Sequence, residues 1–332
     1  MEFEMNLEQN IFSLAKDLKD KTYIHGGYIG FFISDPKLRH IHKATVRDRV
    51  LHHAVFNSLN PIFEPTFIND SFSCRVGKGT HKGVSAVENM LRKASKNNTR
   101  NCYALKCDIR KFFDSVDQPT LLSMVTKRIK DPDIIWLMEK LISSYNSLTE
   151  ATPERERESF TASQSAVKLT VSGKGIPIGN LTSQLFANVY MNEFDQFMKH
   201  DLRIKYYARY TDDFLIISES QDYLLSLIPK ISVFLENRLK LTIHSEKIFI
   251  CKYSQGVDFL GYVIFPKHRL VRKRTSKRIY RKLKQKTEDF KQAKLSEENL
   301  IQTLKSYEGV LSHANTHKFL EKLRNNFWLW LN

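Results

Sequence analysis

The stretch YYARYTDDFLIIS, Tyr206 to Ser218, places two adjacent carboxylates between two apolar runs. The residues on both sides are aromatic, β-branched or aliphatic, which is typical of strands that enter a core. Two strands joined at Asp212 and Asp213 predict a β-hairpin with both carboxylates at an exposed tip. Because Asp is a common turn residue, an ordinary polar turn is the alternative interpretation of this pair alone.

A third carboxylate ends another apolar stretch. Asn101 to Ile109, NCYALKCDI, is predicted to form a strand that carries Asp108 near its end. If this strand lies beside the hairpin, Asp108 and Asp212 converge at one edge of the sheet. Clustered carboxylates cannot all stay ionised at close range without cations between them. Oxygen ligands suit Mg²⁺, and two such ions about 4 Å apart support phosphoryl transfer, so the acids predict a nucleotidyl-transfer site.

The charge of the chain points to a polyanionic partner. Lys and Arg number 52 against 36 acidic residues, which gives a net charge of +16 and a pI near 9.5. Residues 267–286 hold eleven Lys or Arg and no acid, whereas a solvated helix face usually mixes both signs. This segment is therefore predicted to contact nucleic-acid phosphates. A generally basic, solubilising surface is the alternative.

Length and composition favour a soluble protein with two or three subdomains. The 332 residues are 42% hydrophobic, which is enough for a sizeable core. No run approaches the roughly 20 apolar residues of a membrane span, and the N-terminus does not resemble a signal peptide. We therefore expect a cytoplasmic location and no membrane partner. The cysteines follow no metal-ligand spacing and are expected to be buried, reduced thiols. They are Cys74, Cys102, Cys107 and Cys251.

The first half of the chain is predicted to be mainly helical outside the Asp108 strand. Helices and short turns are expected in the first hundred residues, including an amphipathic helix over Lys43 to Leu59. Cys74 to Val84 has the composition of a loop. Asp117, with Pro119 just after it, is typical of a helix start.

In the second half, Ser147 to Lys174 is polar and is interpreted as a flexible loop or an insertion. Helical spacing returns over Ser183 to Lys199. Val257 to Phe265 is predicted to form a strand with a bend at Gly261. Three helical patterns follow Lys267, and the first of them is strongly basic.

Six blocks of the chain resemble, in order, those of reverse transcriptases over about 220 residues, from Arg47 to Phe265. YTDD by itself is a weak signal for the YxDD box, whereas six ordered blocks are specific. The fingers block, the first catalytic block and the template-supporting block are CRVGKGTHKG (74–83), KCDIRKFFDSVD (106–117) and GIPIGNLTSQLFANVYMNEFD (175–195). The YxDD box and two later palm blocks are YTDD (210–213), LKLTIHSEKIFI (239–250) and VDFLGYVIF (257–265).

The resemblance implies an α+β fold, the right-hand polymerase with fingers, an antiparallel-sheet palm and a helical thumb. It implies fingers over 1–100 and 120–172, a palm over 101–119 and 173–265, and a thumb over 266–332. No covalent ribonuclease H, nuclease or maturase extension is expected, which disfavours a retroviral or intron-encoded protein. Template RNA, a primer or cDNA strand and dNTPs are the implied partners.

The resemblance also implies a catalytic set. Asp108 and Asp212 are expected to bind both metal ions, Mg²⁺ or Mn²⁺, with Asp213 less directly placed. The carbonyl of Ile109 is expected to complete one coordination shell. Lys247 is expected to protonate the departing pyrophosphate, and a surface lysine is the alternative.

Nucleotide and duplex contacts follow from the same resemblance. Arg75 and Lys78 are expected to hold the triphosphate, since their groups pair well with phosphate oxygens; a generic basic loop is the alternative. Phe113 is expected to pack under the sugar and exclude a 2′-hydroxyl, with simple core packing as the alternative. The residues expected to contact the duplex are Arg272, Lys273, Arg274, Lys277, Arg278 and Arg281.

The template-supporting block (175–195) indicates which class of reverse transcriptase the chain resembles. Most bacterial reverse transcriptases carry Gln-Gly followed by Ser-Pro, whereas this chain has Ile178-Gly179 and Ser183-Gln184. That form resembles the reverse transcriptases of diversity-generating retroelements, which are related to those of group II introns. Those enzymes copy a template-repeat RNA into cDNA with frequent errors opposite adenine, and they work with a small basic accessory protein.

The same block places Ile178, Gly179 and Gln184 at the nucleotide. An isoleucine cannot make the hydrogen bond of a glutamine, so Ile178 is expected to relax fidelity; simple packing against the palm is the alternative. A stand-alone reverse transcriptase of antiphage defence and a catalytically silent RNA-binding scaffold are the rival functions. The intact acids argue against the scaffold.

Overall fold

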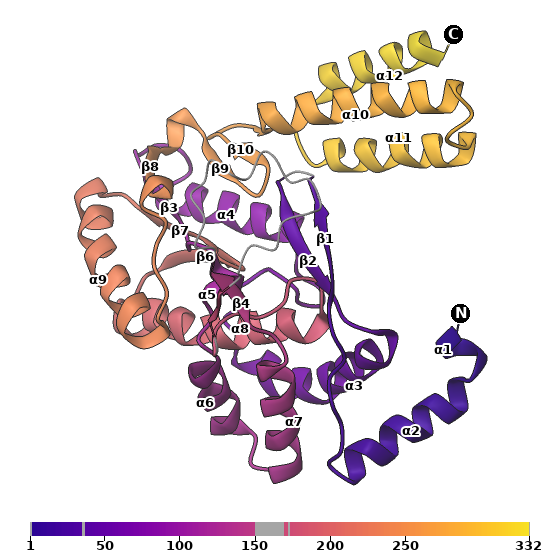
Figure 1. The fold of residues 1–332 in the computed structure, drawn as a ribbon. Helices are drawn as coiled ribbons and strands as arrows, with labels where there is room; N and C mark the ends of the chain where they lie inside the picture. The colour runs from indigo at the N-terminus through magenta and orange to yellow at the C-terminus, as the bar shows by residue number, and fades with distance from the viewer. Residues whose placement is uncertain (1, 35–36, 150–168, 172, 332) are drawn as a thin grey trace.

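The computed structural model describes residues 2–34, 37–149, 169–171 and 173–331 (Figure 1). An antiparallel sheet with the strand order β6-β7-β3-β8 lies at its centre. Its strands are β3 (Tyr103–Asp108), β6 (Tyr206–Tyr210), β7 (Asp213–Ser218) and β8 (Phe249–Lys252). The predicted hairpin and the predicted neighbouring strand are therefore confirmed.

The side chains of the sheet alternate between two hydrophobic cores, as a strand period of two requires. Leu105 and Phe214 face a core built with α3 (Val46–Phe63), α8 (Leu181–Gln196) and α9 (Gln221–Leu239). Ala104 and Leu215 face the opposite core, which contains α4 (Thr80–Ala94). Helices thus cover both faces of the sheet and hold its edge in place.

The N-terminal part differs from the sequence-based prediction. It begins with α1 (Glu2–Met5) and α2 (Leu7–Lys19), but an antiparallel hairpin of β1 (Ile29–Ile33) and β2 (Arg39–Lys43) follows. The prediction of helices and turns alone was therefore wrong here. All five residues of β1 are exposed, so the hairpin lacks the alternation of a half-buried strand.

The amphipathic helix predicted from Lys43 is confirmed as α3, although it begins at Val46 because Lys43 still belongs to β2. Thr45 caps it by accepting a hydrogen bond from the backbone N–H of Asp48. A short helix, η1 (Glu64–Thr66), follows. The predicted loop from Cys74 is shorter than expected, because α4 already begins at Thr80.

The predicted helix start at Asp117 is confirmed. Its carboxylate accepts a hydrogen bond from the backbone N–H of Thr120 at the start of α6 (Gln118–Arg128), and α7 (Pro132–Ser143) follows. The polar segment Ser147 to Lys174 carries paired strands near both ends, β4 (Ser147–Thr149) and β5 (Leu169–Val171). The expected flexible loop falls mostly on residues 150–168, which lie outside the described residues.

The stretch predicted as one bent strand is two strands. β9 (Val257–Phe259) and β10 (Tyr262–Ile264) turn at Leu260 and Gly261, both with positive φ, and β11 (Arg269–Val271) extends this small sheet. The three helical patterns at the C-terminus are confirmed as a bundle of α10 (Lys273–Lys291), α11 (Glu297–Ser312) and α12 (His317–Leu331) (Figure 1). The remaining short helices are α5 (Phe112–Ser115), η3 (Phe197–Asp201), η4 (Ser245–Lys247) and η5 (Tyr253–Gln255).

All four cysteines are free thiols, but Cys74 is exposed on the loop before α4, so the expectation that all are buried was wrong. Cys102 and Cys107 are buried as expected, and Cys251 is half-buried. Within the described ranges, no helix has both the length and the apolarity that crossing a bilayer requires.

Candidate active site

Three carboxylates meet at one edge of the central sheet. The register of β3 and β7 sets Asp108 directly opposite Asp213, and Asp212 occupies the turn between β6 and β7. Their convergence, predicted from two separate strands, is confirmed, although Asp213 rather than Asp212 is the direct partner of Asp108. The turn is half-buried, so the expectation of an exposed tip was wrong.

Burial and mutual repulsion disfavour full ionisation of this cluster. Burial raises the pKa of Asp212 to about 6, and the charges of Asp108 and Asp213 add to the rise. Burial also raises the pKa of Asp213, against the opposing charge of Lys106. A low-dielectric site with adjacent carboxylates creates a demand for positive charge.

Two lysines meet part of that demand. Lys247 Nζ donates a hydrogen bond to Asp108 Oδ2 at 3.1 Å, which places this predicted residue beside the acids. Lys106 Nζ lies 3.7 Å from Asp213 Oδ1. Sequence reasoning missed Lys106, although residues two apart on a strand share a face and Lys106 precedes Asp108 by two.

The donor set suits a hard divalent cation. Three carboxylates supply the oxygen ligands that Mg²⁺ prefers, and their repulsion would be relieved by it. Among the described residues, no three His, Cys, Asp or Glu side chains form a ready-made ligand set. Waters and substrate oxygens would therefore complete the coordination, as is usual for Mg²⁺. Ile109 is buried next to Asp108, and the role of its carbonyl stays a prediction.

The segments that carry Phe113 and Ile178 are joined by a backbone hydrogen bond. Phe112 is the core residue of its pair, whereas Phe113 is half-buried and packs against the same core, so its sugar contact stays a prediction. The carbonyl of Phe113 accepts a hydrogen bond from the backbone N–H of Ile176 at 2.8 Å. This bond ties the first catalytic block to the segment that carries Ile178. Gln184 is exposed in the first turn of α8.

Strand β2 is fastened to the Ile178 segment. The backbone N–H of His42 donates to the carbonyl of Ile178 at 2.8 Å, and Asn180 Nδ2 donates to the carbonyl of His42 at 2.9 Å. Gly179 has φ +116°, and a Cβ there would lie 2.8 Å from the Ile41 side chain. Only glycine fits this combination of backbone conformation and close approach.

Arg75 and Lys78, on the loop before α4, both donate hydrogen bonds to other groups of the protein. Arg75 donates to Glu64 and to the carbonyls of Ile68 and Ser71, and its side chain is only 6% exposed. Lys78 Nζ donates to the carbonyl and the side-chain oxygen of Asn69. These contacts favour a structural role for Arg75, and a triphosphate contact by either residue stays a prediction.

Two other cations act electrostatically on Asp213, which the sequence did not predict. The charges of Lys37 and Arg272 both lower the pKa of Asp213 against the effect of burial. Lys37 follows the hairpin strand β1, and Arg272 precedes α10, where it also pairs with Asp258. Nothing in the local sequence of either residue shows this effect, because both come from other parts of the fold.

The basic segment forms one face of α10. Lys273, Lys277, Arg281 and Lys284 are exposed at helical spacing, and Ile279 and Leu283 are buried on the opposite side. Arg274 is also exposed and Arg278 is half-buried. Arg272, whose charge acts on Asp213, directly precedes α10, so the basic face begins next to that residue.

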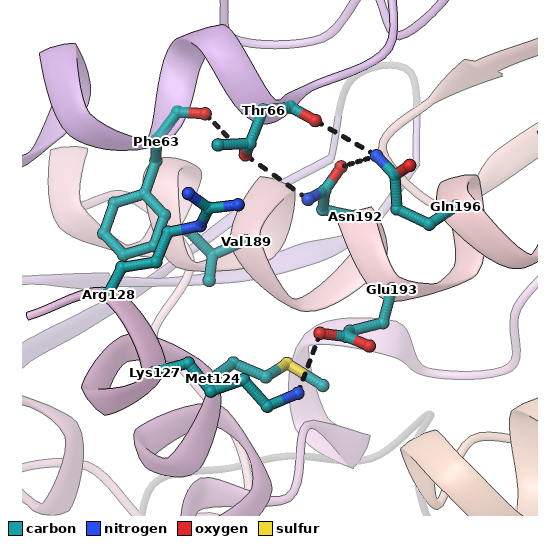
Figure 2. Close-up of a pocket in the computed structure, with 9 residues that line it drawn as sticks. All are labelled: Phe63, Thr66, Met124, Lys127, Arg128, Val189, Asn192, Glu193 and Gln196. Atoms are coloured by element: carbon teal, nitrogen blue, oxygen red, sulfur yellow. Dashed lines mark hydrogen bonds and ion pairs between the residues drawn. The ribbon is translucent and has the colours of Figure 1, made fainter.

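A separate surface pocket of about 540 Å³ lies between α3, α6 and α8 (Figure 2). Phe63, Met124 and Val189 form its apolar part, and Lys127 pairs with Glu193 at 3.0 Å at its rim. None of the predicted site residues lines this pocket. The candidate active site is therefore the acid cluster.

Comparisons with known proteins show the family to which the chain is similar. A profile of the family "Reverse transcriptase (RNA-dependent DNA polymerase)" matches residues 34–264. Protein YkfC of Escherichia coli is 26% identical and is matched over 73% of this chain and 65% of its own. The group II intron-encoded protein LtrA of Lactococcus lactis is 24% identical, over 77% of this chain and 50% of its own. The chain thus spans between half and two thirds of these relatives.

A solved structure shows the same fold. Telomerase from Candida tropicalis, in complex with a fragment of telomeric RNA, aligns with a TM-score of 0.50 at 15% identity. The alignment covers 84% of this chain and 52% of the telomerase chain. The α+β right-hand polymerase architecture expected from the sequence is confirmed.

Replacing Asp212 with Asn is expected to stabilise the cation-free protein at pH 8 and to leave its stability unchanged below pH 4. The pKa of Asp212 is about 6 in the fold, against an ordinary value of 3.8. Between these values the folded state binds more protons, so wild-type stability falls as the pH rises. The variant should gain about 3 kcal/mol of unfolding free energy at pH 8.

Urea unfolding of both proteins across pH 4 to 8, with a chelator present, measures this difference. A stability difference that does not change with pH would contradict the proposed burial and repulsion of Asp212.

Proposed function

The chain belongs to the reverse transcriptase (RNA-dependent DNA polymerase) family, and from that premise we propose that it synthesises DNA on an RNA template. The convergence of Asp108, Asp212 and Asp213 at one sheet edge carries this proposal. Clustered carboxylates with Lys247 in contact form the kind of site that nucleotidyl transfer requires. A silent scaffold would not need this arrangement, which raises the pKa of Asp212.

Each site residue has a proposed task. Asp108, Asp212 and Asp213 would hold the divalent cations with the Ile109 carbonyl, and the cations would supply activation of the primer 3′-hydroxyl and stabilisation of phosphate charge. Lys247 donates a hydrogen bond to Asp108 and would deliver a proton to the departing pyrophosphate. The half-buried ring of Phe113 would pack against the sugar and exclude a 2′-hydroxyl.

The basic face of α10 would hold the template–primer duplex. Its exposed cations are spaced along one side of the helix, which suits contacts to successive phosphates. We propose the domain limits expected from the sequence, with fingers over 1–100 and 120–172, a palm over 101–119 and 173–265, and a thumb over 266–332.

We further propose that the enzyme is of the diversity-generating type. Ile178, Gly179 and Gln184 support this, because their form resembles that class and their segment is bonded to the block that carries Phe113. The template would be a template-repeat RNA, copied with errors opposite adenine, and a small basic accessory protein would assist. Ile178 keeps its backbone bond to β2 but offers no side-chain hydrogen bond to the nucleotide.

The polymerase proposal is tested by extension of a DNA primer on an RNA template with dNTPs and Mg²⁺. The wild-type protein should extend the primer, and Asp212→Ala and Asp213→Ala should each lower the rate by at least about 10²-fold. Glu193→Ala removes an exposed acid of the remote pocket and should leave the rate unchanged. Template binding without any extension by the wild type would instead favour the scaffold.

Fidelity tests the role of Ile178. Replacing Ile178 with Gln is expected to lower misincorporation opposite template adenine about fivefold, the effect of one net hydrogen bond. Errors opposite the other template bases, sequenced from the same cDNA, serve as the internal control. An unchanged error rate opposite adenine would leave Ile178 as a packing residue only.

Salt dependence tests the α10 face. Replacing Lys273, Lys277 and Arg281 with Gln should weaken duplex binding and lower the slope of log K against log salt by about 3. Arg272 is left intact because it pairs with Asp258. Lys305, Lys318 and Lys322, exposed on α11 and α12, give a control variant of equal charge change. Equal losses in both triple variants would show that net charge, and not this face, binds the duplex.

A further inference from the structure

Arg209 is a fully buried cation that lies three residues before Asp212. Its side chain is 0% exposed, as is that of its partner Asp195 on α8. The guanidinium donates from Nε to Asp195 Oδ1 at 2.8 Å and from Nη2 to Asp195 Oδ2 at 2.6 Å. A bidentate pair of this kind fixes the plane of the guanidinium as well as neutralising its charge.

One of the remaining guanidinium bonds reaches the turn that carries the acids. Nη1 donates to the carbonyl of Thr211 at 3.0 Å, and Nη2 donates to Ser71 Oγ at 3.0 Å. Thr211 directly precedes Asp212 and has a positive φ of 56°. This conformation is uncommon for non-glycine residues and costs free energy. The Arg209 bond to the Thr211 carbonyl helps to hold it.

A second tether holds the same turn. Thr211 Oγ1 donates to Ser73 Oγ at 2.6 Å, and the carbonyl of Ser73 accepts from Asn188 Nδ2 on α8 at 3.0 Å. Both tethers lead from the turn to α8, one through Asp195 and the other through Asn188. The position of the acids therefore depends on α8, the helix that packs against the sheet.

Stability alone does not account for this arrangement. A buried ion pair costs desolvation of two charges, and apolar residues of similar volume are often as stabilising. What apolar residues cannot do is bond a carbonyl in a strained turn. We propose that Arg209, fixed by Asp195, is a positioning residue that holds the Thr211 carbonyl and thereby sets the place of the Asp212 carboxylate. This inference rests on the proposed function, because it concerns the same metal-binding acids.

Variants of two residues that contact Asp195 separate a role in positioning the turn from a role in the stability of the fold. Arg209→Lys keeps a positive charge beside Asp195 but lacks the planar fork needed to reach Asp195, Thr211 and Ser71 together. Tyr207→Phe removes the hydroxyl that donates to Asp195 Oδ1 at 2.7 Å and has no bond to the turn. Both changes disturb the same buried charge pair, and only the first loosens the turn.

Manganese binding to the full chain, measured by the EPR signal of free Mn²⁺, gives a readout that does not depend on activity. Arg209→Lys should raise the midpoint about tenfold and lower kcat for primer extension, while Tyr207→Phe lowers the melting temperature but keeps the wild-type midpoint. An unchanged midpoint in Arg209→Lys, or an equal rise in Tyr207→Phe, would overturn the proposal.

A gentler variant covers the case in which Arg209→Lys does not fold. Ser71→Ala removes one partner of Nη2 and leaves the ion pair intact, and it should raise the Mn²⁺ midpoint about threefold; no rise would overturn the proposal. Asp212→Asn identifies the site: if it does not weaken Mn²⁺ binding to the otherwise wild-type chain, the proposed function fails. Failure of the Arg209 variants alone refutes only the positioning role.

Discussion

Repulsion among three carboxylates at one edge of an antiparallel sheet is the constraint on which the site depends. The register of β3 and β7 forces Asp108 and Asp213 to face each other, and the turn adds Asp212. Cores on both faces of the sheet prevent the strands from moving apart to relieve the repulsion. Lys247 and Lys106 neutralise part of the charge, while burial and then the charge of Asp108 raise the pKa of Asp212.

Buried contacts outside the acids keep this arrangement in place. The Arg209–Asp195 pair connects the turn to α8. Just before α8, β2 is fastened by a backbone bond from His42 to Ile178 and by the side chain of Asn180. The turn that carries the acids and the proposed nucleotide segment are therefore attached to the same helix. This connection would give the proposed cation site and the proposed substrate contacts a common rigid support.

The acid cluster was predictable from the sequence, because a strand period of two and a hairpin fix where the carboxylates point. The β1–β2 hairpin was not, since its exposed residues show no alternation. Composition also failed to show which partners the basic loop residues have. Arg75 pairs with Glu64. Lys37 belongs to no recognisable motif, yet its charge lowers the pKa of Asp213. Arg209 was passed over because an isolated Arg in an apolar strand gives no sign of its partner on α8.

The central claim is that Asp108, Asp212 and Asp213 together hold divalent cations. Anomalous diffraction from crystals soaked in MnCl₂ tests it most directly, because it locates the ion without relying on turnover. We expect a peak between Asp108 and the Asp212–Asp213 turn, with Lys247 and Lys106 no longer in contact with the acids. Crystals that show Mn²⁺ elsewhere, with both lysine contacts unchanged, would contradict it.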